Sequence, residues 1–234
     1  MIDFLCIIQA RLNSSRLPAK VMMSLGGGTL LQRVYETVEK SNNIDKIVIA
    51  TSSQVSDNII AQHSKEMDVI CFRGSLNNVL KRFYDVSRLY NAKNIVRITA
   101  DNPLMDAELI DNLIDHFKSS KSDVDYSMFN NGVYGLSAEV FSFSALKNAF
   151  NNTNNNSDKE HVTTYIRNNL IVNNIDIHSP YNRPELSATI DTLEDYERME
   201  AFYLFCENRN YEQNVDNYIL YLDKAKDSEF STRY

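Results

Sequence analysis

The stretch Lys46–Phe72, KIVIATSSQVSDNIIAQHSKEMDVICF, holds two short apolar runs separated by one amphipathic segment. The runs Lys46–Thr51 and Val69–Phe72 predict buried strands. Between them the pair Ser56–Asp57 offers a helix start, and the helix is expected to run to Glu66. A strand, a helix and a second strand at this spacing form a β-α-β unit, which predicts a parallel sheet.

The same alternation extends in both directions from this unit. Two further strands are predicted, over Phe4–Gln9 and Asn94–Thr99. The expected helices are Thr29–Ser41, Leu76–Tyr90 and Asp106–Ser119. Because strands and helices alternate up to about residue 120, we expect an α/β fold with a doubly wound, mostly parallel sheet and right-handed crossovers.

The rest of the chain is less regular. The predicted strands there are Asp125–Phe129, Glu139–Phe143, Leu170–Ile177 and Leu186–Ile190, and the predicted helices are Phe143–Phe150, Asp158–Asn168 and a last one within residues 191–205. The polar run Asn151–Asn156 indicates a flexible loop. Since no repeat or linker interrupts the chain, we expect one domain over residues 1–234, with a less regular region at about 125–185.

Composition restricts the classes of function. The 234 residues carry a net charge of −7, which argues against a general nucleic-acid binder but leaves room for a local basic pocket. The three cysteines are far apart, so we interpret them as reduced thiols of a cytoplasmic protein. The first residues do not resemble a signal peptide, and no apolar run is long enough to cross a bilayer, so no membrane role is expected.

The loop Gln9–Val21 follows the first strand and holds Arg11, Arg16 and Lys20 but no acid. Ligands of open parallel sheets bind at the carboxyl ends of the strands. The loop has no glycine, so it carries neither a dinucleotide-binding fingerprint nor a Walker lysine motif. The three cations would therefore hold phosphates with their side chains. The alternative is a solvated basic loop without a ligand.

Two aspartates are predicted at the same rim. Asp101 follows the fourth strand and Asp191 follows the strand expected at Leu186–Ile190. Two carboxylates from separate strands suit Mg²⁺, which fills its shell with water and substrate phosphates. The alternatives are that Asp101 forms a turn and that Asp191 caps a helix with Glu194 as its capping-box partner.

Other polar residues give weaker signals. Arg73 and Ser75 follow the third strand, where they could touch a ligand. Arg97 lies inside the fourth strand, so it must find an anion or face a cleft. His161 stands beside Glu160, and a lone histidine is more often structural than catalytic.

Seven motifs carry a resemblance to a known family. They are IIQARLNSSRLPAKVM, IVIATS, FRGSLNNVLKRF, VRITADNPLMD, AEVFS, KEHVT and TIDTLED. Their order resembles that of the spore coat polysaccharide biosynthesis protein F family, which belongs with the acylneuraminate and 3-deoxy-manno-octulosonate cytidylyltransferases. The similarity covers about residues 4–200. The chain departs from the family at Asn77 and Asn78, where an acid is common, at Ala188, where a tryptophan is common, and in the shortened stretch 130–138.

The resemblance implies a nucleotidyltransferase with a Rossmann-like fold of the glycosyltransferase-A kind. It implies CTP as donor, Mg²⁺ as cofactor, a sugar or sugar acid as acceptor in surface polysaccharide synthesis, and a homodimer. The implied catalytic residues are Arg11, Lys20 and Asp101, and the implied metal ligands are Asp101 and Asp191. The implied nucleotide-binding residues are Gln9, Ala10, Arg11, Arg16, Lys20, Thr51, Arg73, Ser75 and Arg97. The implied acceptor-binding residues are Glu139, Glu160 and His161.

Two other functions stay open at this point. The tripeptide Asp123-Val124-Asp125 has the Asp-x-Asp form of metal-dependent glycosyltransferases that use nucleotide-sugars. A non-catalytic nucleotide-binding homologue is the second alternative. Neither the acceptor nor the base preference follows from the sequence.

Overall fold

The structure is a computed structural model that describes residues 2–120, 123–136 and 138–226. Its main sheet has seven strands in the order β5-β4-β1-β6-β8-β7-β9. The strands are β1 (Ile2–Gln9), β4 (Lys46–Ser52), β5 (Cys71–Gly74), β6 (Ala92–Thr99), β7 (Tyr126–Asn130), β8 (Glu139–Ser142) and β9 (Ile175–Asp176). Strands β5, β4, β1 and β6 are parallel to one another, β8 is antiparallel to both β6 and β7, and β9 is parallel to β7. The predicted doubly wound, mostly parallel α/β sheet is thus confirmed.

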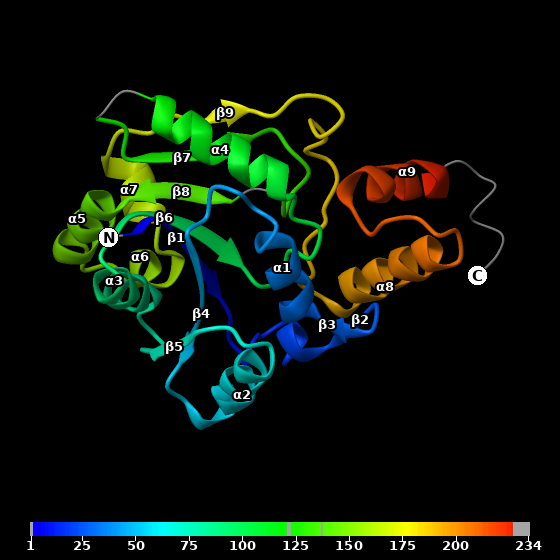
Figure 1. Cartoon of the computed structure of the whole chain (residues 1–234), viewed down its shortest axis with the longest axis horizontal. Helices are drawn as coiled ribbons and strands as arrows, with labels where there is room; N and C mark the ends of the chain where they lie inside the picture. Colours follow the sequence, from blue (N-terminus) through cyan, green and yellow to red (C-terminus); the bar gives the residue numbers. More distant parts are fainter. Residues whose placement is uncertain (1, 121–122, 137, 227–234) are drawn as a thin grey trace.

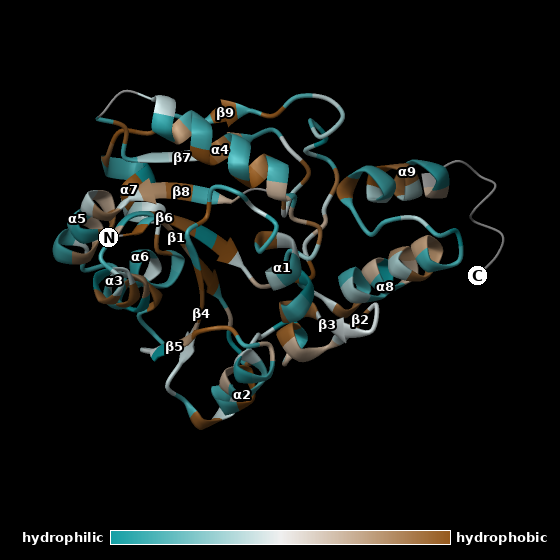
Figure 2. Cartoon of the chain, viewed as in Figure 1, coloured by the Kyte–Doolittle hydropathy of each residue, from teal (hydrophilic) through white to brown (hydrophobic). Residues whose placement is uncertain are grey.

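Helices cover both faces of this sheet (Figure 1). They are α1 (Leu30–Val38), α2 (Asn58–Glu66), α3 (Val79–Leu89), α4 (Ala107–Ser119), α5 (Phe143–Asn152), α6 (Asn156–His161), α7 (Thr164–Asn169), α8 (Leu193–Glu207) and α9 (Val215–Lys226). Side chains alternate along β1, so Cys6 and Ile8 belong to the core under α1 and α4, whereas Leu5 and Ile7 belong to the core under α3 and α5. Figure 2 shows hydrophobic residues along these central strands.

The first crossover contains a small hairpin. Strands β2 (Ser24–Leu25) and β3 (Gly28–Thr29) are joined through Gly26 and Gly27, which have φ of 55° and 84°. Helix α8 packs against this turn so closely that a Cβ at Gly26 would lie 2.4 Å from the Tyr203 ring. Glycine is therefore required at Gly26 by both backbone conformation and packing.

Several elements of the second half differ from expectation. The helix expected over 158–168 is interrupted at Val162, which has φ of 60°, so the segment forms α6 and α7. The polar run 151–156 is loop only at 153–155, because α5 extends to Asn152 and α6 begins at Asn156. The strand expected over 186–190 reduces to one bridge between Tyr134 and Ser187. Helix α9 lies beyond the expected elements, and it packs beside α8 away from the sheet (Figure 1).

No helix within the described ranges is long and apolar enough to cross a lipid bilayer.

Candidate active site

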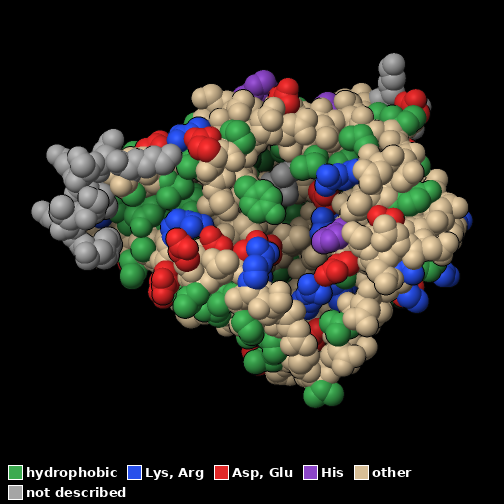
Figure 3. Space-filling view, turned by 180° about the vertical axis from the view of Figure 1, so that it is seen from behind, with side chains coloured by type: hydrophobic (Ala, Val, Ile, Leu, Met, Phe, Trp, Pro, Cys, Tyr) green, Lys and Arg blue, Asp and Glu red, His purple; other side chains and the backbone are tan. Residues whose placement is uncertain are grey.

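Two adjoining cavities open at the carboxyl ends of β1 and β6. The large cavity has a volume of about 630 Å³ and the small cavity about 200 Å³. They form one cleft, because both are lined by Arg16, Arg97, Thr99, Asp101, His161 and Asp191. Charged side chains gather around a hollow on this face of the molecule (Figure 3). The cleft therefore lies where the parallel-strand rule predicts a ligand.

Lys20 is the central charge of the cleft. It begins a short 3-10 helix, Lys20–Met22, directly after Ala19, which has the left-handed φ of 61°. Its Nζ donates to Asp101 Oδ2 at 2.8 Å, to Asp191 Oδ1 at 2.9 Å and to the carbonyl oxygen of Ile190 at 2.7 Å. An ammonium has three donors, so all of them are used. Lys20 was expected at the phosphates, and here it neutralises the two predicted metal ligands.

Asp101 and Asp191 are brought together by the backbone as well as by Lys20. The amide of Ile190 donates to the carbonyl oxygen of Asp101 at 2.9 Å, which joins the end of β6 to the segment before α8. The two carboxylates are about one-fifth exposed, and Arg16 Nη2 lies 2.9 Å from Asp191 Oδ1. Both acids therefore face one cleft while lying far apart in the sequence.

Asp191 is not the cap of the last predicted helix. The N-cap of α8 is Thr192, whose side chain accepts from the amide of Asp195, and the Asp195 carboxylate accepts from the amide of Thr192. The alternative of a cap formed by Asp191 with Glu194 is therefore wrong, by one residue at each position. This shift frees the Asp191 carboxylate for the cleft.

The donor set fits a hard divalent ion only in part. Within the described ranges, no group of three or more His, Cys, Asp and Glu side chains is close enough to hold a metal ion. Asp101 and Asp191 alone would supply two carboxylates, which suits Mg²⁺ because this ion takes its remaining ligands from water and substrate phosphates.

Arg11 contacts helix α6 across the mouth of the small cavity. Its Nη2 lies 3.2 Å from Glu160 Oε1, and both side chains are about half exposed. Exposed pairs of this kind contribute little stability, so Arg11 can turn to a ligand at small cost. His161, next to Glu160, lines both cavities.

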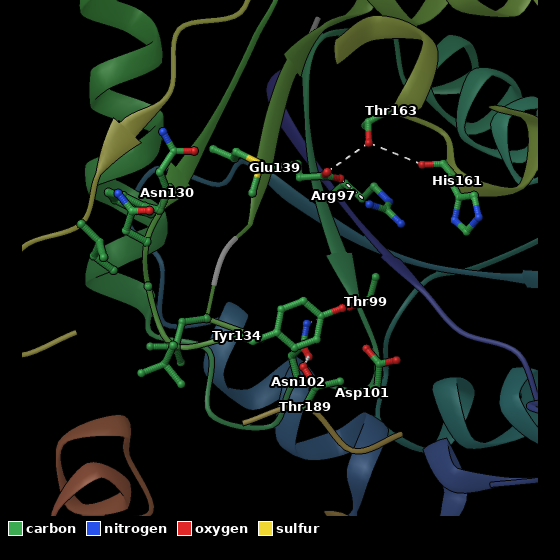
Figure 4. Close-up of a pocket in the computed structure, with 18 of the residues that line it drawn as sticks. Arg97, Thr99, Asp101, Asn102, Asn130, Tyr134, Glu139, His161, Thr163 and Thr189 are labelled. Carbon is green, nitrogen blue, oxygen red and sulfur yellow. Dashed lines mark hydrogen bonds and ion pairs between the residues drawn. The ribbon is translucent and has the colours of Figure 1, made fainter. Parts of the chain in front are cut away.

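Arg97 on β6 and Glu139 on β8 are paired across the two strands, and both line the large cavity (Figure 4). The Glu139 carboxylate is buried and accepts from Arg97, from Tyr126 Oη at 2.8 Å and from Thr163 Oγ1 at 3.0 Å. Burial acts to raise the pKa of Glu139, but Arg97 and these hydrogen bonds together hold it below its ordinary value. Arg97 also donates from Nε to Gln9 Oε1 at 3.0 Å. Glu139 thus fixes the orientation of Arg97, which lines both cavities.

Three of the expected nucleotide contacts lie elsewhere. Arg73 donates to the carbonyl oxygens of Ser52 and Gln54 at 3.0 and 2.7 Å and to Asn58 Oδ1 at 2.7 Å. Ser75 Oγ accepts from the amide of Asn78, the N-cap of α3, and Thr51 is fully buried. None of the three lines either cavity. The structure therefore does not bring Arg73, Ser75 and Thr51 to the other candidates.

The sequence did not reveal one residue that lines the cleft, Arg82, and one that supports its basic loop, Asp57. Asp57 was interpreted as a helix start, but its buried carboxylate accepts from the amide of Leu12 at 2.8 Å and from the Ser52 hydroxyl, so it holds the basic loop in place. Arg82 lines the small cavity from α3 and is only 2% exposed. Aspartate and arginine are rarely buried. A charged residue at a position expected to be buried, with no obvious partner in the sequence, is therefore the signal that could have revealed both.

The loop Asn130–Leu136 forms much of the large cavity wall. Gly135 has φ of 97°, and a Cβ there would lie 2.5 Å from Thr189 Oγ1. Thr189 in turn donates to Asn102 Oδ1 at 2.8 Å. The close approach requires glycine and fixes this loop against the rim that carries Asp101.

The Asp-x-Asp tripeptide lies away from this cleft. Asp125 accepts from the amide of Ile171 at 3.3 Å and from Ser142 Oγ at 3.5 Å. Neither aspartate of the tripeptide lines the large or the small cavity.

The family profile described as cytidylyltransferase matches residues 5–224. The chain belongs to the cytidylyltransferase family. It is 37% identical over 212 residues to the spore coat polysaccharide biosynthesis protein SpsF of Bacillus subtilis (strain 168), and the match covers 87% of each chain. The predicted family and the nucleotidyltransferase class are thus confirmed.

Solved structures share the fold of this cytidylyltransferase. A cytidylyltransferase from Leptospira borgpetersenii serovar Hardjo-bovis (strain JB197) superposes with a TM-score of 0.85 at 24% identity, covering 100% of this chain and 98% of that one. A CMP:2-keto-3-deoxy-manno-octonic acid synthetase in complex with CTP gives a TM-score of 0.67 at 13% identity, covering 88% of this chain and 99% of that one. The Rossmann-like fold expected from the motifs is therefore confirmed.

Proposed function

We propose that this cytidylyltransferase transfers CMP from CTP to a sugar acid and releases pyrophosphate. The observation that carries the proposal is one cleft in which two carboxylates meet a cationic loop: Asp101 and Asp191 contact Lys20, and Arg16 contacts Asp191. A nucleoside triphosphate binds together with a divalent cation. Its site therefore needs carboxylates for the cation and arginines for the phosphates.

The reaction forms a bond between an acceptor oxygen and the α-phosphorus and breaks the bond from that phosphorus to the bridging oxygen of pyrophosphate. The protein contributes mainly position and charge to such a transfer. Arg11 and Arg16 would neutralise the departing pyrophosphate, since both line the small cavity. Asp101 and Asp191 would hold Mg²⁺, and the ion would supply further charge neutralisation and lower the pKa of the acceptor hydroxyl.

The large cavity suits an acidic acceptor of monosaccharide size. Its volume of about 630 Å³ is in the range of small-molecule sites, and its lining includes the cations Arg97 and Arg167 together with His161. The Arg97 guanidinium is held in place by Glu139 and Gln9. A carboxylate on the acceptor would pair with this positive wall. The name of the second solved relative, which acts on an octonic acid, agrees with that chemistry.

The test is pyrophosphate release with CTP, Mg²⁺ and a set of nonulosonic and octulosonic acids. We expect release with at least one acid and a strong loss in Asp101→Asn. The matched control is Asp115→Asn, because Asp115 is 63% exposed and lies outside both cavities. Nucleotide binding without product from any acid would instead favour a non-catalytic homologue. Release of a nucleoside diphosphate from nucleotide-sugars would favour a glycosyltransferase.

We also infer one functional unit that forms a homodimer in the cytoplasm. Leu193, Leu204 and Leu220 on α8 and α9 are exposed, which supports a partner surface there. Free cysteines support a reducing compartment. A solution mass near the 26.9 kDa of one chain would contradict the dimer.

A further inference from the structure

Arg82 is a buried cation that the protein satisfies only in part. It is 2% exposed, and its Nε has no hydrogen-bond partner. Its Nη1 donates to the carbonyl oxygen of Ser75 over a long 3.4 Å, and no ion pair involves Arg82 within the described ranges. Burying a charged group without partners costs free energy. The burial of Arg82 therefore indicates a partner that the protein itself does not supply.

The environment of Arg82 keeps it charged but poorly compensated. Burial lowers the pKa of Arg82, the negative charge of Asp57 opposes this and the positive charge of Arg11 adds to it, so that the pKa is about 10. The guanidinium is therefore still a cation at neutral pH, where it would gain from an acceptor that arrives with a ligand.

Arg82 is fixed in position and faces a part of the small cavity with aliphatic walls. A Cβ at Gly74 would lie 3.0 Å from Arg82 Cγ, so the stem of the side chain is packed against that glycine. Val79 lies one turn earlier on α3, and Ala10 follows β1. Both line the small cavity and are at most 4% exposed. Two small aliphatic side chains beside a planar donor suit the edge of a heterocyclic base better than a phosphate.

We propose that Arg82 is the residue that selects the base of the nucleotide, with its guanidinium donating to O2 and N3 of cytosine and with Ala10 and Val79 packing against the ring. This inference rests on the proposed function. Cytosine presents two adjacent acceptors at O2 and N3, whereas uracil presents a donor, N3–H, at the second position. A guanidinium that offers two donors therefore prefers CTP to UTP, because a site built for one hydrogen-bond pattern rejects the other.

The test compares Arg82→Met and Arg82→Lys with Arg88→Met, a control on an exposed position of the same helix. Calorimetric titration gives the affinities for CTP, UTP and inorganic pyrophosphate, and thermal unfolding is measured without nucleotide.

In Arg82→Met we expect CTP affinity to fall about tenfold or more while UTP and pyrophosphate affinities stay close to wild type. We also expect an unchanged or higher unfolding temperature, because an unsatisfied buried charge is removed. Arg82→Lys keeps the charge but loses the fork, so it should also lose the preference for CTP. Arg88→Met should match wild type.

Each of the following outcomes would contradict a specific part of the proposal. A less stable Arg82→Met that binds CTP as wild type does would make Arg82 structural. Equal losses for CTP, UTP and pyrophosphate would make it a phosphate contact. A wild-type protein that turns over CTP, with unchanged base preference in both Arg82 variants, would refute this inference alone. A wild-type protein that neither binds CTP nor releases pyrophosphate would refute the proposed function and this inference together.

Discussion

Replacement of Lys20 by methionine tests the charge balance of the cleft. The substitution keeps most of the side-chain length but removes the ammonium that lies 2.8 Å from Asp101 and 2.9 Å from Asp191. It leaves two carboxylates facing each other with Arg16 as the remaining cation on one of them. We expect a less stable protein that regains stability when a divalent ion replaces the lost charge.

The size of the effect follows from burial. Removing one partner from a buried ion pair costs about 3–5 kcal/mol. The Lys20 side chain is 9% exposed, but the two carboxylates are 23% and 22% exposed, so the low end of about 3 kcal/mol applies. For a chain of this length, that corresponds to a fall of about 6–12 °C in unfolding temperature. An ion present at about a hundred times its Kd for the freed carboxylates would restore about 2.7 kcal/mol.

The assay is thermal unfolding without nucleotide at increasing Mg²⁺ concentration. Lys20→Met should show a large rise with the ion, whereas wild type should show a small one because Lys20 already occupies the carboxylates. Lys40→Met, at an exposed position, is the control. The double variant Lys20→Met/Asp101→Asn should respond less to the ion than Lys20→Met alone. Equal Mg²⁺ responses in wild type and Lys20→Met would refute the idea that the ammonium and the ion compete for one place.

Three further substitutions test supporting contacts. Glu139→Gln should cost about 3 kcal/mol at pH 7 in urea unfolding. Because the folded pKa of Glu139 is lowered, this difference should be complete above about pH 4.3 and disappear as pH falls through the folded value; a constant difference down to pH 2 would contradict it. Thr192→Ala should cost about 1 kcal/mol, while Glu194→Ala should cost almost nothing; equal losses would contradict the observed cap. Asp57→Asn should loosen the loop at Leu12 and raise the KM for CTP more than it lowers kcat, and unchanged kinetics would refute that link.

The first half of the fold was predictable because its strands are buried on both faces and its helices on one. Such strands are continuous apolar runs, and β1 and β4 show this pattern clearly. The second half was less so. Periodicity does not reveal that β8 runs antiparallel to β6, and the break at Val162 uses a positive φ at a residue that carries no turn signal.

The site was predictable in its acids and less so in its cations. Carboxyl ends of neighbouring strands share one edge, which is why Asp101 was expected to reach the rim where Asp191 also lies. The position of the Lys20 ammonium depends on the left-handed conformation of Ala19, and alanine gives no indication of it in the sequence. A loop of three cations therefore predicted charge in the cleft but not which cation would meet the acids.

The contrast between Arg73 and Arg82 shows what a sequence can still reveal. Both belong to the motif FRGSLNNVLKRF, and the arginine directly after a strand was the natural choice for a ligand contact. The structure turns Arg73 toward backbone carbonyls outside the cleft and Arg82 into it. Helical phase already separates them: Arg82 lies three residues after Val79 and four before Val86, so it shares the buried face of α3. A cation in phase with an apolar face must be neutralised by the protein or by a ligand, and the described ion pairs contain no protein partner for it. That position, rather than proximity to a strand end, is the physical reason to assign Arg82 to the nucleotide.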